Sequence, residues 1–366
     1  MATTARASQP ELTFLNLGRA RLDALWRAVH QRDCPDDVRT RFTSLFETWG
    51  TRAIGRTPRW PSDIGDDHSP FEFSLVLGGA EPELRVLLEA QGQEPTYAST
   101  RQAALDLDAV LERDGADLSR LRAVQSLFLH DAPGSLFSLW HAASLVPGAP
   151  HYKAYLNPRV GEPGSSFALA SEALARLGLQ AAVPTLESAR QSPDDDVRYF
   201  GIDLQRTEKS RVKVYLYQPG ATTAHYERLA AMAPRYRAGE ATALCRALTG
   251  FDGPYTRYPL CTYLSFVEGS DRPYEVTIQV PIRFYCPDDQ IARSRVLAFL
   301  ESRSLDPQPY DDALYALARR PLSRGSGLQT YVSLRLGEPT PRVAVYLAVE
   351  AYAADERRAS GVRRAT

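Results

Sequence analysis

Pairs of strand-length segments alternate along the chain with segments of helical periodicity, and this alternation limits the folds that are open to it. Apolar residues recur at helical spacing in residues 19–30, 38–49, 100–113, 165–177, 221–232, 239–248, 290–302 and 309–318. The expected hairpins pair residues 71–77 with 84–88, 136–142 with 152–156, 198–204 with 211–218, 262–267 with 275–284, and 330–336 with 343–350. The sequence therefore predicts about ten strands in five hairpins, with helices between them.

Five hairpins in one chain create many strand edges, and unpaired edges promote aggregation. Closing the sheet into a barrel removes the edges, and a barrel of ten strands has room inside it. We therefore expect an α+β fold, in which a ten-stranded antiparallel barrel is surrounded by helices in repeated αββα units. No linker rich in Ser, Gly or Pro divides the chain. We expect one domain over residues 11–353, a flexible N-terminus (1–10) and a flexible C-terminal tail (354–366).

The composition argues against several classes of partner. The formal net charge is −1, and no basic tract occurs before the arginines that follow Asp355, so nucleic acid is not favoured as a partner. The longest apolar runs have the length of strands, and residues 1–10 lack the apolar stretch of a signal peptide. We therefore expect no membrane segment and a cytoplasmic location.

The cysteines and histidines show no metal-site spacing. The four cysteines include no CxxC pair, and the six histidines never pair at the spacing of a helical metal site. We expect reduced cysteines that serve in packing, and we expect neither a metal nor a cofactor.

Lysine is rare in this chain, which holds three lysines and forty arginines. Two of the lysines occur in the same local pattern, Lys153-Ala154-Tyr155 and Lys213-Val214-Tyr215. Residues two apart on a strand face the same side, so each pattern places a compact ammonium beside a phenol on one face of a sheet. The alternative is an amphipathic strand with a solvated polar face. Because the pattern is repeated, we favour the interpretation that this face of the sheet binds a phosphorylated ligand.

The predicted inner face of the barrel is polar. The positions expected to point inward are Lys153, Tyr155, Arg211, Lys213, Tyr215, Tyr217, Gln279, Gln329, Tyr331 and Tyr346. Because unpaired buried cations are costly, such an interior indicates a wet or liganded chamber that presents its cations to an anion. The eighteen tyrosines of the chain agree with this chamber, since a phenol offers both an aromatic face and a hydroxyl.

Five short motifs follow one another along the predicted strands. They are Ser69-Pro70-Phe71-Glu72-Phe73-Ser74, Lys153-Ala154-Tyr155, Arg211-Val212-Lys213-Val214-Tyr215, Thr330-Tyr331-Val332-Ser333 and Val345-Tyr346-Leu347. In this order they resemble the dimethylallyltryptophan synthase type of aromatic prenyltransferase, particularly its shorter bacterial members. The resemblance implies the prenyltransferase barrel, or ABBA fold. It also implies an enzyme of secondary (alkaloid) metabolism that moves a dimethylallyl group from dimethylallyl diphosphate to the indole of L-tryptophan or a tryptophan derivative, by electrophilic aromatic substitution and without a metal.

Glu72 is the carboxylate that most constrains the chemistry. On a strand, Glu72 and Ser74 would share the inner face, and a buried carboxylate costs free energy unless a cation or a hydrogen-bond donor meets it. The resemblance implies that the donor is the indole N–H, so that Glu72 stabilises the arenium-like cation and helps its proton leave. A structural glutamate paired with an arginine is the alternative. The resemblance further implies that Arg198 holds the amino-acid end of tryptophan and that Asn157 lies near the aromatic substrate.

The same resemblance implies the residues that meet the prenyl donor. Glu72, Lys153 and Lys213 would be catalytic. The residues implied for the diphosphate are Arg85, Lys153, Arg211, Lys213, Tyr215, Gln279, Tyr331 and Tyr346. The residues implied for a shield around the prenyl cation are Tyr155, Tyr215, Tyr331 and Tyr346. Charge-assisted hydrogen bonds to the diphosphate would strengthen as the C–O bond breaks, and phenol faces would stabilise the allylic cation while excluding water.

The chain lacks the aspartate motif that binds magnesium in other prenyltransferases. Asp66-Asp67-His68 and Asp194-Asp195-Asp196 both lack the second, spaced aspartate of DDxxD or NDxxD, and both clusters are expected to be solvated loop charges. Basic side chains would then replace the metal.

Two departures from the family pattern leave the identity of the donor and of the acceptor undecided. Thr277 and Gln279 stand where many relatives place a tyrosine and a Gln or Lys, and Asn157 stands where some relatives have a tyrosine. The donor chain length and the acceptor are therefore not decided by the motifs. A tyrosine, phenolic or polyketide acceptor stays open, as does a non-catalytic barrel that only binds a phosphorylated or hydrophobic ligand.

Overall fold

The computed structural model describes residues 12–132, 134–135, 137–148, 150–162, 164–337 and 342–352. The predicted flexible ends, 1–10 and 354–366, lie outside the described residues, as do the outermost residues of the predicted domain, 11 and 353.

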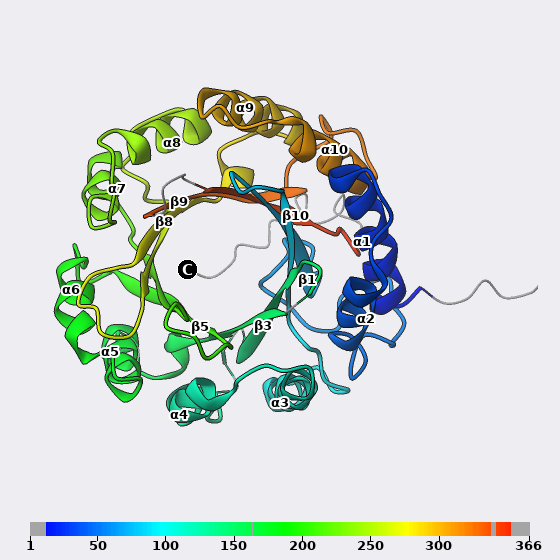
Figure 1. Cartoon of the computed structure of the whole chain (residues 1–366), viewed down its shortest axis with the longest axis horizontal. Coiled ribbons are helices and arrows are strands. Elements are labelled where there is room, and N and C mark those ends of the chain that lie inside the picture. Colours follow the sequence, from blue (N-terminus) through cyan, green and yellow to red (C-terminus); the bar gives the residue numbers. More distant parts are fainter. Residues whose placement is uncertain are drawn as a thin grey trace, which may run out of the picture.

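Ten antiparallel strands close into a barrel, and a ring of helices surrounds it (Figure 1). Neighbouring strands in the sequence are neighbours in the sheet, and β1 pairs with β10 to close it. The strands are β1 (Phe71–Leu77), β2 (Glu83–Leu88), β3 (Leu139–Leu145), β4 (His151–Leu156), β5 (Asp196–Asp203), β6 (Val212–Tyr217), β7 (Cys261–Phe266), β8 (Glu275–Val280), β9 (Gln329–Leu336) and β10 (Arg342–Ala348). The predicted fold class is confirmed, and the barrel leaves no free strand edge.

Two helices precede each hairpin, which gives the repeated αββα units that the sequence predicts. The helices are α1 (Phe14–His30), α2 (Asp36–Ser44), α3 (Tyr97–Arg113), α4 (Ser119–Phe128), α5 (Ser166–Arg176), α6 (Val183–Ser188), α7 (Thr223–Ala230), α8 (Glu240–Thr249), α9 (Asp289–Ser302) and α10 (Gln308–Leu317). The sequence reading missed α4 and α6. α6 has only six residues, which is too short for a clear helical period. α4 did carry a usable start signal, because the Asp117 carboxylate accepts from the Ser119 N–H at the first residue of the helix.

Most predicted strands differ from the observed ones by one or two residues at an end, and two differ by more. The strand predicted over residues 136–142 is β3, Leu139–Leu145, and residue 136 lies outside the described residues. His141 faces the helices, where its Nε2 lies 2.8 Å from Asp108 Oδ1 on α3, and this distant partner cannot be read from local alternation. The strand predicted over 275–284 ends at Val280, because Pro281 has no N–H to continue the ladder.

The two faces of β1 divide as the sequence predicts. Phe71 and Phe73 point to the helices, where their rings contact those of Phe46 and Phe42 at centroid distances of 5.1 and 5.9 Å. Glu72 points into the barrel. The apolar core of the protein therefore lies between the barrel and its helices, which leaves the inner face free for polar side chains.

A β-bulge in β9 reverses one prediction. Tyr331 is opposite Tyr346, but Gln329 is opposite Leu347, so Thr330 is the extra residue. Gln329 consequently turns outward, where its amide contacts Tyr310 and Asp289. The expectation that Gln329 points inward is wrong, and Thr330 takes the inward position. Local alternation cannot show a bulge, because the bulge depends on pairing with β10.

Candidate active site in the barrel lumen

The inner face of the barrel changes in character along its length. Glu72 is opposite Leu87, whereas Ser74, two residues further along β1, is opposite Arg85 on β2. Glu72 therefore lies nearer one end of the barrel than Arg85 does. The charged side chains gather toward the Arg85 end, tyrosines occupy the middle, and Glu72 lies at the other end.

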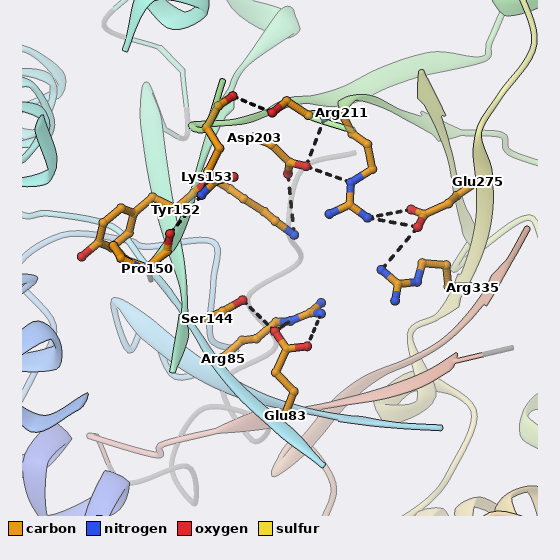
Figure 2. Close-up of polar contacts among 12 residues, drawn as sticks. Glu83, Arg85, Ser144, Pro150, Tyr152, Lys153, Asp203, Arg211, Glu275 and Arg335 are labelled. Carbon is orange, nitrogen blue, oxygen red and sulfur yellow. Dashed lines mark hydrogen bonds and ion pairs between the residues drawn. The ribbon is translucent and has the colours of Figure 1, made fainter. Parts of the chain in front are cut away.

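Eight charged side chains form what we call the charge cluster. They are Glu83, Arg85, Lys153, Asp203, Arg211, Lys213, Glu275 and Arg335. Figure 2 shows that seven of them, from widely separated strands, point toward a common space inside the barrel. The structure thus brings together the four cations that the resemblance implies, and it adds Arg335.

Arg211 connects two of the carboxylates in the charge cluster. Its Nε lies 2.8 Å from Asp203 Oδ2, and its Nη1 lies 2.9 Å from Glu275 Oε2. Lys153 Nζ lies 3.9 Å from Asp203 Oδ1, and Arg335 Nη1 lies 3.6 Å from Glu275 Oε1. Two carboxylates therefore hold three cations in position (Figure 2).

The third carboxylate, Glu83, holds Arg85. Arg85 donates from Nε and Nη2 to the two oxygens of Glu83, both at 2.8 Å, and Ser144 Oγ donates to Glu83 Oε1 at 2.7 Å. The sequence analysis missed all three carboxylates of the charge cluster. Glu83 and Arg85 are two apart on one strand, so their spacing was a usable signal. The pairing of Glu275 with Arg211 joins strands far apart in the sequence and left no such signal.

Lys213 differs from the other cations of the charge cluster. Its side chain is buried, and its ammonium makes no hydrogen bond or ion pair with the residues that the structure describes; its nearest aromatic contact is the Tyr263 ring, 5.3 Å away. Burial, and then the positive charges of Arg211 and Lys153, hold the pKa of Lys213 well below its ordinary value. Burial likewise lowers the pKa of Lys153 to about 8. An anion in this space would raise the pKa of both lysines and so favour their charged forms.

Tyrosines form a belt beside the charge cluster. The Tyr215 ring stacks on Tyr263 at 4.3 Å and meets Tyr155 and Tyr199 edge-on at 5.9 and 5.7 Å. Gly201 lies opposite both Tyr155 and Lys213, and a Cβ at Gly201 would come within 3.5 Å of both side chains. The absence of a side chain there leaves room for the tyrosines.

Two tyrosines of this belt, Tyr199 and Tyr263, were missed by the sequence analysis. Tyr263 is opposite Tyr215 across β6 and β7, and Tyr199 is opposite Tyr215 across β5 and β6. Tyr199 faces inward because a bulge falls between Val197 and Tyr199. The predicted shield residues Tyr331 and Tyr346 lie together on β9 and β10, with ring centroids 6.2 Å apart.

Glu72 lies in a buried polar pocket at the far end of the lumen. Its Oε2 accepts a hydrogen bond of 2.9 Å from the Thr330 hydroxyl, and its side chain is almost fully buried. Burial raises the pKa of Glu72 to about 7, while the Thr330 hydrogen bond and the charge of Arg283 act to lower it. Glu72 can therefore gain or lose a proton near neutral pH, which is what a general base requires.

Arg283 organises this pocket and was missed by the sequence analysis. Its Nε lies 3.0 Å from Asp66, its Nη1 donates to the Thr330 carbonyl at 3.0 Å, and its Nη2 donates to the Tyr331 hydroxyl at 3.2 Å. Arg283 follows Pro281, in a segment that was expected to be strand, so its direction could not be predicted.

The aspartate clusters differ from the expectation of solvated loop charges. Asp67 is buried and accepts from the Ser69 N–H and hydroxyl. Asp195 is also buried, and Gln218 donates to it at 2.7 Å. Only Asp194, among these three, is exposed. The prediction was wrong for Asp67 and Asp195, because each carboxylate also has a donor that is distant in the sequence: the Tyr352 N–H for Asp67 and the Gln218 amide for Asp195.

The residues predicted for the aromatic substrate have different surroundings. The Arg198 guanidinium lies 4.6 Å from the centre of the Tyr217 ring, and no carboxylate of the described residues forms an ion pair with it. Asn157 is buried, and its amide donates to the Phe137 carbonyl and accepts from the Arg159 N–H. Against the effect of burial, the charge of Asp63 helps to raise the pKa of Arg198, but Arg198 can still meet a carboxylate ligand, whereas the amide of Asn157 already serves the backbone. Both assignments stay predictions.

A second buried carboxylate, Glu89, accepts a hydrogen bond of 3.1 Å from the indole N–H of Trp140. Burial raises the pKa of Glu89 to about 7. Trp140 packs on Phe137 and Tyr199 at ring distances of 4.1 and 5.3 Å. Glu89 thus fixes one aromatic side chain of the lumen, and neither residue was singled out from the sequence.

The last two predicted positions lie on β8. Gln279 is opposite Cys261 and Ser333, and Thr277 is opposite Tyr263. Both therefore lie on the inner face beside the tyrosines. The role of Gln279 toward the diphosphate stays a prediction.

Within the described residues, no group of three or more His, Cys, Asp or Glu side chains is arranged to hold a metal ion. The described helices include none whose length and apolarity would let it cross a membrane. The four cysteines are free and buried, as expected.

Comparison with known proteins decides the family. The model of the family described as tryptophan dimethylallyltransferase matches residues 35–313. The chain belongs to this family. It is also similar to 6-dimethylallyltryptophan synthase from Micromonospora olivasterospora, whose crystal structure holds DMASPP and Trp: 36% of residues are identical, the match covers 93% of this chain and 98% of the other, and the TM-score is 0.83.

Two further relatives agree with this assignment. The crystal structure of 5-dimethylallyltryptophan synthase from Streptomyces coelicolor shares 30% sequence identity with this chain; the match covers 93% of this chain and 99% of the other, and the TM-score is 0.83. The prenyltransferase anuH of Penicillium roqueforti is 24% identical over an alignment of 356 residues, and the match covers 80% of this chain and 78% of the relative. The prediction of a dimethylallyltryptophan synthase-type protein is confirmed, and the bacterial relatives match the expected bacterial type.

Proposed function

We propose that this protein transfers a dimethylallyl group from dimethylallyl diphosphate to the indole ring of tryptophan or a close derivative. The observation that carries the proposal is the order of groups along the lumen: an excess of cations, then a belt of tyrosines, then a buried carboxylate. This order matches an electrophilic substitution, in which an anion leaves, a cation crosses a short distance and a proton is lost.

The charge cluster would promote ionisation of the donor. As the C–O bond breaks, its electron pair moves to the diphosphate oxygen, and the negative charge that grows there strengthens the hydrogen bonds from Arg85, Lys153 and Lys213. Lys213 has no competing partner among the described residues and is therefore the cation most available to that oxygen.

The tyrosine belt would protect the allylic cation. Phenol faces stabilise a cation and exclude water, and Tyr155, Tyr215 and Tyr346 lie on the inner face between the charge cluster and Glu72. The indole ring then supplies the electron pair of the new C–C bond.

Glu72 would act on the acceptor. An ionised Glu72 accepts the indole N–H hydrogen bond, stabilises the positive charge that the ring acquires, and helps the ring proton leave. Arg198, at the same end of the barrel, would bind the amino-acid carboxylate. An indole acceptor is favoured over a phenol because the chain belongs to the tryptophan dimethylallyltransferase family, and Glu72 can accept the indole N–H hydrogen bond.

One assay tests the proposed function. The protein is incubated with dimethylallyl diphosphate and a panel that includes tryptophan, tryptophan derivatives, tyrosine and a phenolic ring, and products are detected by mass. A gain of one dimethylallyl unit on tryptophan or a derivative is expected. A product on phenols alone would move the activity to the phenolic class, and no product with any acceptor would favour a ligand-binding barrel.

Activity is expected to survive an excess of EDTA. We propose a metal-independent transferase, because the five cations of the charge cluster outnumber its three carboxylates and present a net positive charge to the diphosphate without magnesium. The measurement is the initial rate with EDTA, compared with the rate in added Mg²⁺. Loss of all turnover in EDTA, with recovery in Mg²⁺, would show that the cluster needs a metal.

The pH dependence of kcat/KM is expected to be bell-shaped, with its maximum between about pH 7 and pH 8. The pKa of Glu72 is about 7, so protonation below that pH removes the base. The pKa of Lys153 is about 8, and burial also holds the pKa of Lys213 well below its ordinary value, so deprotonation of these lysines at higher pH removes cations from the donor site. The acidic limb should disappear in Glu72→Gln while the basic limb stays. An unchanged acidic limb in that variant would assign it to another group.

A further inference from the structure

The charge cluster contains three carboxylates, which is unexpected in a site for an anion. Glu83, Asp203 and Glu275 are buried or nearly so and point into the same space as the cations (Figure 2). Each carboxylate repels a bound diphosphate. If the site served only to bind diphosphate tightly, apolar or neutral polar groups would be expected at these three positions. The presence of three carboxylates therefore needs a physical explanation.

The carboxylates are ionised whenever the protein is folded near neutral pH. Burial alone would raise the pKa of Glu275, but Lys213, Arg211 and Arg335 together lower it to about 2. Neighbouring cations likewise hold the pKa of Asp203 and of Glu83 well below their ordinary values, against the effect of burial. The cluster therefore combines up to five positive charges with three permanent negative ones.

The carboxylates occupy some hydrogen-bond donors of the cations and leave others free. Arg211 uses Nε for Asp203 and Nη1 for both oxygens of Glu275, at 3.0 and 2.9 Å. Its Nη2 makes no hydrogen bond with the described residues, and neither does the ammonium of Lys213. A diphosphate can thus contact both groups without displacing a carboxylate.

Product release gives the carboxylates a function. Inorganic diphosphate carries at least as much negative charge as the donor's diphosphate group, so a cluster of five unopposed cations would hold the product as firmly as it holds the leaving group. Each fixed negative charge weakens the attraction for donor and product alike. At saturating donor, the weaker attraction reduces occupancy of the site by the donor only slightly. It also shortens the time for which product diphosphate blocks the site.

We propose that Glu275, together with Asp203 and Glu83, weakens the hold of the charge cluster on product diphosphate, so that release of diphosphate does not limit turnover. This inference rests on the proposed function. Glu275 is the carboxylate to test, because it is fully buried and contacts both Arg211 and Arg335. In this role it acts through charge, in addition to positioning Arg211.

The test measures the binding of inorganic diphosphate by calorimetry, without turnover. Glu275→Gln keeps the shape and removes one negative charge, so the Kd of diphosphate is expected to fall by about tenfold, as one unit charge at an effective dielectric near 20 allows. Steady-state kcat should fall below the rate of the first turnover, so that a burst of prenylated product precedes a slower steady rate. Glu240→Gln is the matched control, because Glu240 is a buried carboxylate that pairs with Arg303 among the outer helices; its diphosphate binding should stay at the wild-type value.

The possible results separate the inference from the proposed function. Weaker or unchanged diphosphate binding in Glu275→Gln would overturn the inference, because a purely positioning carboxylate loses binding when it is removed. Failure of the wild-type protein to bind diphosphate at all would instead overturn the proposed function. If Glu275→Gln does not fold, Asp203→Asn is measured in the same way, and the same tightening is required.

Discussion

Replacing Glu72 with Gln is expected to reduce turnover by about 10² to 10⁴-fold, the usual contribution of a general base. Gln keeps the size of the side chain and its hydrogen bond with the Thr330 hydroxyl, but it cannot hold a negative charge beside the arenium-like ring. The affinity for dimethylallyl diphosphate should change little, because the charge cluster lies toward the other end of the barrel. The measurement is kcat and the KM of each substrate at pH 7.5.

Two comparisons make the Glu72 result interpretable. Thermal unfolding should show a Tm at or above the wild-type value, because burial of an ionised carboxylate costs free energy and Gln removes that cost. Glu240→Gln, which neutralises a buried carboxylate outside the barrel, should keep wild-type turnover. An active Glu72→Gln variant would mean that Glu72 is the structural partner of Thr330 and Arg283.

Replacing Lys213 with Ala is expected to reduce turnover by about 10² to 10³-fold, the usual loss when one group that stabilises a developing anion is removed. The affinity for inorganic diphosphate should fall as well. Stability should change little, because relief from burying an unpaired cation offsets the packing that is lost. Turnover, diphosphate Kd and Tm are measured on the same preparation.

Two further variants define what Lys213 supplies. Lys209→Ala is the control, since Lys209 is the remaining lysine of the chain and is exposed; it should behave as wild type. Lys213→Arg should recover only part of the activity, because a guanidinium is larger and planar, and the Tyr263 ring lies 5.3 Å from the ammonium. Full recovery in Lys213→Arg would show that any cation is sufficient at this position.

The lumen was predictable wherever strand alternation alone decides which way a side chain points. Glu72 points inward while Phe71 and Phe73 point outward, as a period of two requires. The same rule placed Lys153 beside Tyr155 and Lys213 beside Tyr215. The rule failed for Gln329, because the bulge in β9 adds one residue to the strand. The strand residues that precede the bulge then point to the opposite face from the one that alternation predicts.

Contacts between distant strands were not predictable. The carboxylates of Asp203 and Glu275 are 72 positions apart in the numbering, yet both hold Arg211. Arg283 pairs with Asp66, and more than half of the sequence separates these two residues. Neither pair leaves a local pattern, since each depends on which strands become neighbours when the barrel closes.

Periodicity and ordered motifs are local properties of the chain, so the ten strands, the polar character of the inner face and the family could be inferred without the structure. Only the tertiary structure decided that the cations share the lumen with three carboxylates, that Lys213 is left without a partner among the described residues, and that Glu72 titrates near neutral pH. The physical reason is that burial and charge pairing are set by neighbours in space. Closure of the barrel brings those neighbours together from strands that are far apart in the sequence.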